Sequence, residues 1–109
     1  MLIAATPAAP YYAVIFTSLR TEGENGYKEM SDRMNELAAR QPGFLGQETV
    51  REVLGVSVSY WRTLEDVRNW KRVAEHVEAQ QKGKDVWYTA YRVRVCLVER
   101  DYGWEKKEV

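Results

Sequence analysis

The hydrophobic pattern along the chain switches between strand and helix periods, and these switches delimit six elements. Residues 11–20, YYAVIFTSLR, are rich in β-branched and aromatic side chains, which predicts a strand. From Tyr27 to about Arg40 apolar side chains recur at helical spacing, which predicts a helix with Asn25 as its N-cap. Pro42 follows, and proline cannot continue a helix.

The middle of the chain predicts an antiparallel hairpin. Residues 44–53 form the expected second strand, Gly55 marks a tight turn, and residues 56–62 form the third strand. Strand alternation divides the third strand into two faces. One face is expected to carry Val56, Val58 and Tyr60, and the other Ser57, Ser59 and Trp61.

A second helix and a long strand complete the pattern. Thr63 and Asp66 have the spacing of a capping box, so the helix is expected from there to about Lys82, with Gly83 as its C-cap. The last strand is expected over about residues 85–100. Its alternation predicts one face with Tyr91, Val93, Val95 and Leu97, and another with Tyr88, Arg92, Arg94 and Cys96.

The element order β-α-β-β-α-β predicts an α+β, ferredoxin-like domain in which two helices cover one face of a four-stranded antiparallel sheet. Several strands carry apolar residues on both sides, so a second copy of the sheet is expected to bury the other face. We expect a flexible N-terminal arm over residues 1–10, the domain over 11–100, and a tail over 101–109 that packs on the partner subunit.

Composition narrows the classes of partner. The 109-residue chain carries 16 basic and 16 acidic side chains, which argues against a nucleic-acid-binding surface. A single cysteine, Cys96, excludes an internal disulfide and favours a cytoplasmic protein. Cys96 lies in an apolar run and is interpreted as a small strand hydrophobe. No apolar run is long enough for a membrane span, and the N-terminus lacks the cationic start of a secretion signal.

The candidate chemistry lies in residues 55–91, which hold Trp61, Trp70, Trp87 and the only histidine, His76. Such a cluster is typical either of a small-molecule pocket or of a core built from large residues. Trp70 lies on the buried stripe of the second helix, as core or as cavity wall. His76 lies about 120° from it, as a general base or as an exposed helix histidine. Asn69, Val73 and Gln80 share the flank of His76.

Other polar groups also have two interpretations. Trp61, Trp87 and Tyr88 lie at strand ends, where their polar atoms can orient a ligand or simply pack. Arg92 and Arg94 either pair with Glu48 or Glu99 across strands, or bind an anionic ligand. The spacing of histidine and cysteine predicts no metal site, and no glycine-rich phosphate loop is present.

Four segments carry a family resemblance: QPGF at 41–44, SYWRTLEDVRNWK at 59–71, HVEAQQKG at 76–83 and WYTAYRVRV at 87–95. In this order they resemble the antibiotic biosynthesis monooxygenase (ABM) domain family, over roughly residues 11–102. The resemblance implies a homodimeric α/β barrel with a cavity between sheet and helices in each subunit. Members of the family include cofactor-independent oxygenases of aromatic polyketides, heme-degrading monooxygenases and proteins without an assigned activity.

The resemblance implies a cofactor-independent, monooxygenase-like protein that acts on an aromatic or hydrophobic small molecule. The oxygenases manage without metal or flavin because a deprotonated, electron-rich phenol reacts with oxygen itself. Their substrate-binding residue types are matched here by Asn69, Trp61 or Trp70, Tyr88 or Tyr91, and Arg92. A non-catalytic, dimeric ligand-binding protein is the alternative.

A heme-binding or heme-degrading protein is less favoured. The heme-degrading members use an asparagine in the first strand, and the matching position here is Phe16. They also use a tryptophan and a histidine on the second helix, and the histidine position falls near Gln80 rather than at His76.

Overall fold

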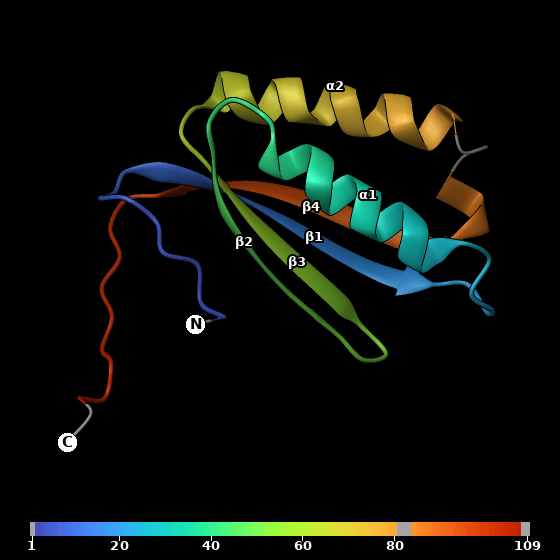
Figure 1. Ribbon diagram of the computed structural model, residues 1–109, viewed down its shortest axis with the longest axis horizontal. Helices are drawn as coiled ribbons and strands as arrows, with labels where there is room; N and C mark the ends of the chain where they lie inside the picture. The colour runs from blue at the N-terminus through green and yellow to red at the C-terminus, as the bar shows by residue number, and fades with distance from the viewer. Residues whose placement is uncertain (1, 81–83, 108–109) are drawn as a thin grey trace.

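The computed structural model describes residues 2–80 and 84–107. Figure 1 shows one twisted antiparallel sheet with both helices on the same face, which confirms the predicted ferredoxin-like order. The strands lie in the order β2-β3-β1-β4. The elements are β1 (Tyr11–Arg20), α1 (Tyr27–Ala39), β2 (Phe44–Arg51), β3 (Gly55–Trp61), α2 (Leu64–Gln80), a short 3₁₀ turn η1 (Lys84–Val86) and β4 (Tyr88–Val98).

The N-terminus of α1 differs from the prediction. Gly26, with a left-handed φ of 78°, is the N-cap, and Asn25 is itself left-handed with a φ of 49°. An N-cap side chain needs an extended backbone to reach the first turn, so Asn25 instead donates to the Glu22 carbonyl at 3.1 Å. The Glu24 carboxylate takes over the capping, because it accepts the backbone N–H groups of Gly26 and Lys28 at 2.9 and 2.7 Å.

The N-terminus of α2 agrees with the prediction in one half of the capping box. The Thr63 hydroxyl accepts the Asp66 backbone N–H at 3.1 Å, so Thr63 is the N-cap. The reciprocal bond is altered: the Thr63 hydroxyl donates to the Asp66 carboxylate at 2.8 Å. Aspartate is one methylene shorter than the usual glutamate, which accounts for the change. The predicted helix end at Lys82 and the C-cap Gly83 lie outside the described residues.

The β2–β3 hairpin turns earlier than predicted. β2 ends at Arg51, which pairs with Gly55 at the start of β3. The turn therefore occupies residues 52–54, where the Glu52 N–H donates to the Leu54 carbonyl at 3.1 Å. Gly55 is the first residue of the strand, and its role is a different one, described below.

The predicted facing of β4 is wrong at Tyr88. Leu19 pairs with Ala90 but Arg20 pairs with Tyr88, so the register shifts by one residue. A bulge adds a residue to one strand and reverses the alternation beyond it. Tyr88 therefore shares the helix-facing side with Tyr91, whose ring centroid is 5.7 Å from its own. The strand also starts later than predicted, because η1 occupies residues 84–86.

The core lies between the sheet and the two helices. Trp61 is completely buried there, packed with Val14, Ala38 and Val67. Its ring stacks on that of Trp70, with centroids 5.9 Å apart and planes at 19°. The helix-facing side of β3 is thus the one predicted for Ser57, Ser59 and Trp61.

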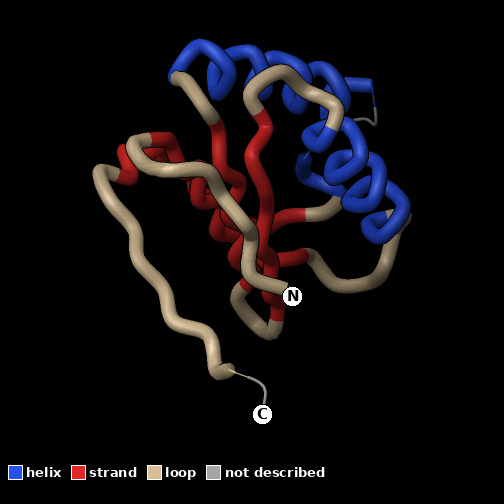
Figure 2. The backbone as a smooth tube through the Cα atoms, turned by 60° about the vertical axis from the view of Figure 1, so that its left-hand side comes forward, coloured by secondary structure: helices blue, strands red, loops and turns tan. Residues whose placement is uncertain are grey.

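The two ends of the chain meet beside the sheet. The Ala4 N–H donates to the Glu48 carboxylate at 2.9 Å, and the Tyr11 hydroxyl bonds to the Asp101 carboxylate. Beyond Asp101 the tail extends away from the domain, as Figure 2 shows, and Tyr102 and Trp104 are 97% and 86% exposed. In the described part of the chain, no helix has the length and apolar character needed to cross a membrane.

Candidate functional site

A cavity of about 280 Å³ lies between the sheet and the two helices. Its wall is formed by α1, α2 and the strands beneath them, and it is mainly apolar and aromatic. The wall includes Val14, Phe16, Met30, Met34, Ala38, Ser57, Ser59, Val67, Trp70, Ala74, Glu78, Tyr88, Tyr91, Val93 and Val95. Mostly apolar walls with a few polar groups are typical of small-molecule sites.

Short side chains create this cavity. Ser57 and Ser59 of β3 point toward the helices, where a strand with large residues would fill the space. Ala74 leaves a similar gap on α2, one turn beyond Trp70. Val93 and Val95 line the cavity and are about half exposed, 48% and 50%. The cavity therefore opens to solvent along the edge strand β4.

An aromatic cluster forms the end of the cavity nearest the start of β4. The Phe16 ring lies 5.5 Å from that of Tyr88 and 5.1 Å from that of Tyr91. Tyr27 of α1 meets Tyr88 edge-on, with centroids 6.0 Å apart. The β4 bulge is responsible for this cluster, because it turns Tyr88 toward the helices.

Tyr88 is kept in its protonated form. Burial raises the pKa of the Tyr88 phenol above its usual value, and the neighbouring Tyr27 phenol raises it further. A phenol held neutral in an apolar wall is a hydrogen-bond donor for an oxygen atom of a ligand.

Glu78 supplies a carboxyl group to the cavity wall. Burial raises the pKa of Glu78, and the negative charge of Glu75 adds to the effect, while the ammonium of Lys84 opposes it. A carboxyl group with a raised pKa is better suited to accept a proton near neutral pH than an ordinary surface glutamate.

The structure brings together three of the residues named from sequence. Trp70, Tyr88 and Tyr91 line the cavity. Trp61 lies behind Trp70 in the core, with its indole N–H donating to the Ser59 hydroxyl at 2.8 Å. Trp87 is buried, and its indole N–H donates to the Asn25 carbonyl at 3.0 Å, which ties the start of β4 to the loop before α1.

The remaining named residues lie elsewhere. The Asn69 amide donates to the Gln41 side chain at 3.4 Å, joining α2 to the end of α1. His76 and Gln80 are exposed, and neither lines the cavity. Arg92 is exposed on the side of β4 that faces away from the helices.

Helix periodicity alone does not identify Glu78 as a cavity residue. Periodicity identifies the buried stripe through Trp70, but it does not say which flank of the stripe borders a cavity. Glu78 lies about 80° from Trp70 on one side, whereas His76 lies about 120° away on the other. The cavity follows the flank with Lys71, Glu75 and Glu78, which is the side of α2 that adjoins the gap between the sheet and α1.

Among the residues that the structure describes, neither a three-residue metal site nor a histidine ligand for heme lines this cavity. Among residues 2–80 and 84–107, no group of three histidine, cysteine or acidic side chains is placed to hold a metal ion. His76 is exposed outside the cavity wall, so its imidazole is not positioned to bind a heme iron there.

Solved structures share this fold at low sequence identity. SnoaB from Streptomyces nogalater, a cofactor-independent oxygenase solved as a mutant, superposes with a TM-score of 0.67 and 15% identity over 85% of this chain and 97% of its own. PA3566 from Pseudomonas aeruginosa superposes with a TM-score of 0.64 and 13% identity, over 86% of this chain and 97% of its own. A candidate antibiotic biosynthesis monooxygenase from Nitrosomonas europaea superposes with a TM-score of 0.64 and 16% identity, over 86% of this chain and 94% of its own. These similarities establish a common fold.

Sequence comparison gives a much nearer relative. No family model matches the chain. The uncharacterized protein YqjZ from Bacillus subtilis (strain 168) is 49% identical over 100 residues, which are 90% of this chain and 88% of that protein. The chain therefore belongs to the family of the Bacillus subtilis protein YqjZ.

Proposed function

We propose that the protein is a cofactor-independent, monooxygenase-like enzyme of the ABM type that takes an aromatic or hydrophobic small molecule. The observation that carries the proposal is the cavity walled by Phe16, Trp70, Tyr88 and Tyr91. The fold shared with SnoaB and the sequence segments that resemble the ABM family support the same assignment.

The cavity sets the size and shape of the ligand. Its volume of about 280 Å³ is close to the lower end of the roughly 300–1,000 Å³ typical of ligand pockets. Flat rings pack well against the Phe16 and Tyr91 faces, and the short side chains of Ser57 and Ser59 leave room beneath them. A compact molecule of one or two fused rings fits best.

The proposed chemistry uses the substrate as its own reductant. Glu78 accepts a proton from an electron-rich phenol, and the Tyr88 hydroxyl stabilises the negative charge that develops on the substrate oxygen. The activated substrate then reduces molecular oxygen. A CH₂ group conjugated to the phenolate becomes a carbonyl with one oxygen atom, and the other oxygen leaves as water with the two CH₂ hydrogens.

A non-catalytic ligand-binding protein is the second candidate. The observation that favours it is the position of His76, which is exposed and lies outside the cavity wall. The cavity therefore lacks an imidazole base, and Glu75 and Glu78 supply the carboxyl groups of its wall. In that case the cavity binds an aromatic molecule without turnover.

We further propose that the protein acts as a homodimer, joined through the sheet face opposite the helices. Val50, 64% exposed, lies on that face of β2, and Val56 and Val58 of β3 lie on the same side. Tyr102 and Trp104 of the extended tail give two further aromatic surfaces for a partner subunit.

Oxygen uptake tests the enzyme proposal. Phenols of one or two rings that carry a conjugated CH₂ group are supplied to the wild type and to two variants. Ala74→Trp fills the cavity, and Arg72→Trp adds the same indole on the exposed side of α2. The proposal expects uptake in the wild type and in Arg72→Trp, and loss in Ala74→Trp. If the wild type binds the phenols but none of the three proteins takes up oxygen, the ligand-binding protein is favoured.

A further inference from the structure

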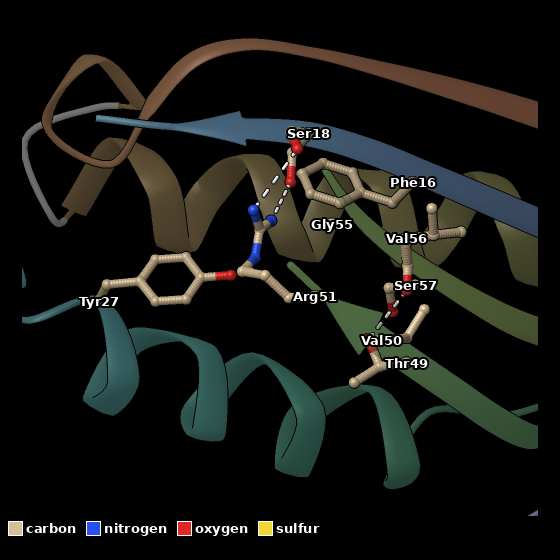
Figure 3. Close-up of a pocket in the computed structure, with 9 residues that line it drawn as sticks. All are labelled: Phe16, Ser18, Tyr27, Thr49, Val50, Arg51, Gly55, Val56 and Ser57. Carbon is tan, nitrogen blue, oxygen red and sulfur yellow. Dashed lines mark hydrogen bonds between the residues drawn. The ribbon is translucent and has the colours of Figure 1, made fainter. Parts of the chain in front are cut away.

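A second, smaller cavity of about 190 Å³ lies near the turn end of the β2–β3 hairpin (Figure 3). It shares Phe16 and Ser57 with the larger cavity, so the two adjoin across these side chains. Its wall also includes Ser18, Tyr27 and Arg51. The aromatic cluster extends into the smaller cavity, because Tyr27 contacts Tyr88 of the larger cavity.

Arg51 brings a positive charge to this smaller cavity. Figure 3 shows its guanidinium directed at Ser18, where it donates to the hydroxyl and, at 3.5 Å, to the backbone carbonyl. Its central carbon is 5.8 Å from the Tyr27 ring centre. Within the part of the chain that the structure describes, no carboxylate forms an ion pair with Arg51.

Arg20 shows what a structural arginine looks like in the same region. Its guanidinium donates to the backbone carbonyls of Trp87, Gly23 and Glu24, and its central carbon lies 3.5 Å from the centre of the Tyr27 ring. Three different carbonyls thus receive its donors. Arg51 instead directs both of its hydrogen bonds to one residue, Ser18. A guanidinium has five N–H donors, so the others remain available for a ligand.

Gly55 makes room for the Arg51 side chain. A β-carbon at position 55 would overlap with Nη2 of Arg51 and with the central carbon of its guanidinium. The glycine is needed for this close approach and not for the hairpin turn, which residues 52–54 make. The space above Gly55 and the hydrogen bonds to Ser18 together place the half-buried Arg51 side chain beside the cavity.

We propose that Arg51 is the anion subsite of the ligand cavity, so that the ligand is an aromatic carboxylic acid. Its rings occupy the larger cavity, and its carboxylate reaches past Phe16 and Ser57 to the guanidinium, whose planar fork matches a carboxylate with two hydrogen bonds. The position of the rings rests on the proposed function, while the carboxylate contact is specific to Arg51.

Two matched ligands test the subsite by titration calorimetry. Naphthalene-2-carboxylate carries the charge, and naphthalene-2-carboxamide has the same rings and shape without it. Wild type is expected to prefer the acid over the amide by about tenfold or more. Arg51→Gln is expected to abolish this preference while keeping the affinity for the amide within about twofold.

Two more variants separate position from charge. Gly55→Ala keeps the guanidinium but displaces it, and is expected to lower the preference for the acid. Arg33→Gln removes an exposed arginine of α1 that lies outside both cavities, and the preference for the acid is expected to remain. Thermal unfolding followed by circular dichroism confirms that each variant folds.

The outcomes distinguish the subsite from the proposed function. If wild type binds both ligands equally, or Arg51→Gln loses both in parallel, the subsite is wrong while the aromatic cavity stands. If wild type binds neither ligand, the aromatic cavity itself is not a binding site and both proposals fall.

Discussion

Tyr88 and Tyr91 lie on the same side of β4 although they are three positions apart in the chain, and their ring centroids are 5.7 Å apart. Regular alternation would place them on opposite faces. The register shift opposite Leu19 and Arg20 turns Tyr88 inward, and this one bulge assembles the aromatic end of the cavity.

Removing the bulge is therefore expected to disassemble the site. Insertion of one alanine between Leu19 and Arg20 gives Thr89 a pairing partner on β1, restores regular alternation and turns Tyr88 to the outer face. Affinity for naphthalene-2-carboxamide should then fall about tenfold, the loss expected for one or two aromatic contacts. Calorimetry measures the affinity. The control is Thr89→Ala, which keeps the chain length and should bind as the wild type does. Equal affinity in both variants would mean that the bulge does not shape the site.

Glu78→Gln is expected to stabilise the protein in a pH-dependent way. Because burial raises the pKa of Glu78, its ionisation is less favourable in the folded state than in the unfolded chain. That cost is absent well below the unfolded pKa, about 4.3, and is fully present above the raised folded pKa. The variant should therefore gain in free energy of unfolding at neutral pH and lose its advantage near pH 3. Denaturant titrations at both pH values check this, and a constant difference would contradict it.

Glu48→Gln is expected to show the opposite sign. A hydrogen bond from the Tyr60 hydroxyl at 2.6 Å, followed by one from the Ala4 N–H, lowers the pKa of Glu48. The ionised carboxylate therefore stabilises the fold above the unfolded pKa, and this contribution disappears as the pH falls through the lowered folded pKa. Because the site is partly exposed, the free energy of unfolding of the variant should be lower by up to about 1 kcal/mol at neutral pH. At low pH it should equal that of the wild type. Unfolding at two pH values measures both.

Trp61→Ala is expected to be among the most damaging core substitutions. The side chain is completely buried and stacks on Trp70, so the loss should be about 3–5 kcal/mol of unfolding free energy. Chemical denaturation measures it. A loss below about 1 kcal/mol would mean that the core relaxes around the missing ring.

Truncation after Asp101 is expected to weaken the proposed dimer. It removes Tyr102 and Trp104 but keeps the Tyr11–Asp101 hydrogen bond, so the domain itself should unfold as before. Light scattering during gel filtration should show a lower mass for the truncated chain than for the full chain at micromolar concentration. If the full chain and the truncated chain both had the mass of a monomer, the proposed dimer would be wrong.

The fold was predictable from sequence because its signals are local. The β-branched run of β1, the Thr63 cap and the stripe through Trp70 each report on one element, and the order of elements then limits the topology. The site depends on relations between elements. The bulge at Tyr88 is set by pairing with β1, and the cavity flank of α2 is set by the position of α1, and neither leaves a periodic mark in the chain.

Glycines show the same limit. The sequence pattern predicts a turn at Gly55, which is the usual role of a glycine between two strands. Its actual reason is the Arg51 side chain that lies over it, a contact visible only when the two strand ends are paired.

The most direct test of the central claim is a nuclear magnetic resonance titration of the labelled protein with naphthalene-2-carboxamide. If the cavity binds aromatic molecules, the signals of Phe16, Trp70 and Tyr88 shift in a saturable way, while those of the exposed His76 stay in place. Shifts confined to Val50, Trp104 and their surroundings, or no saturable shifts at all, would contradict the account.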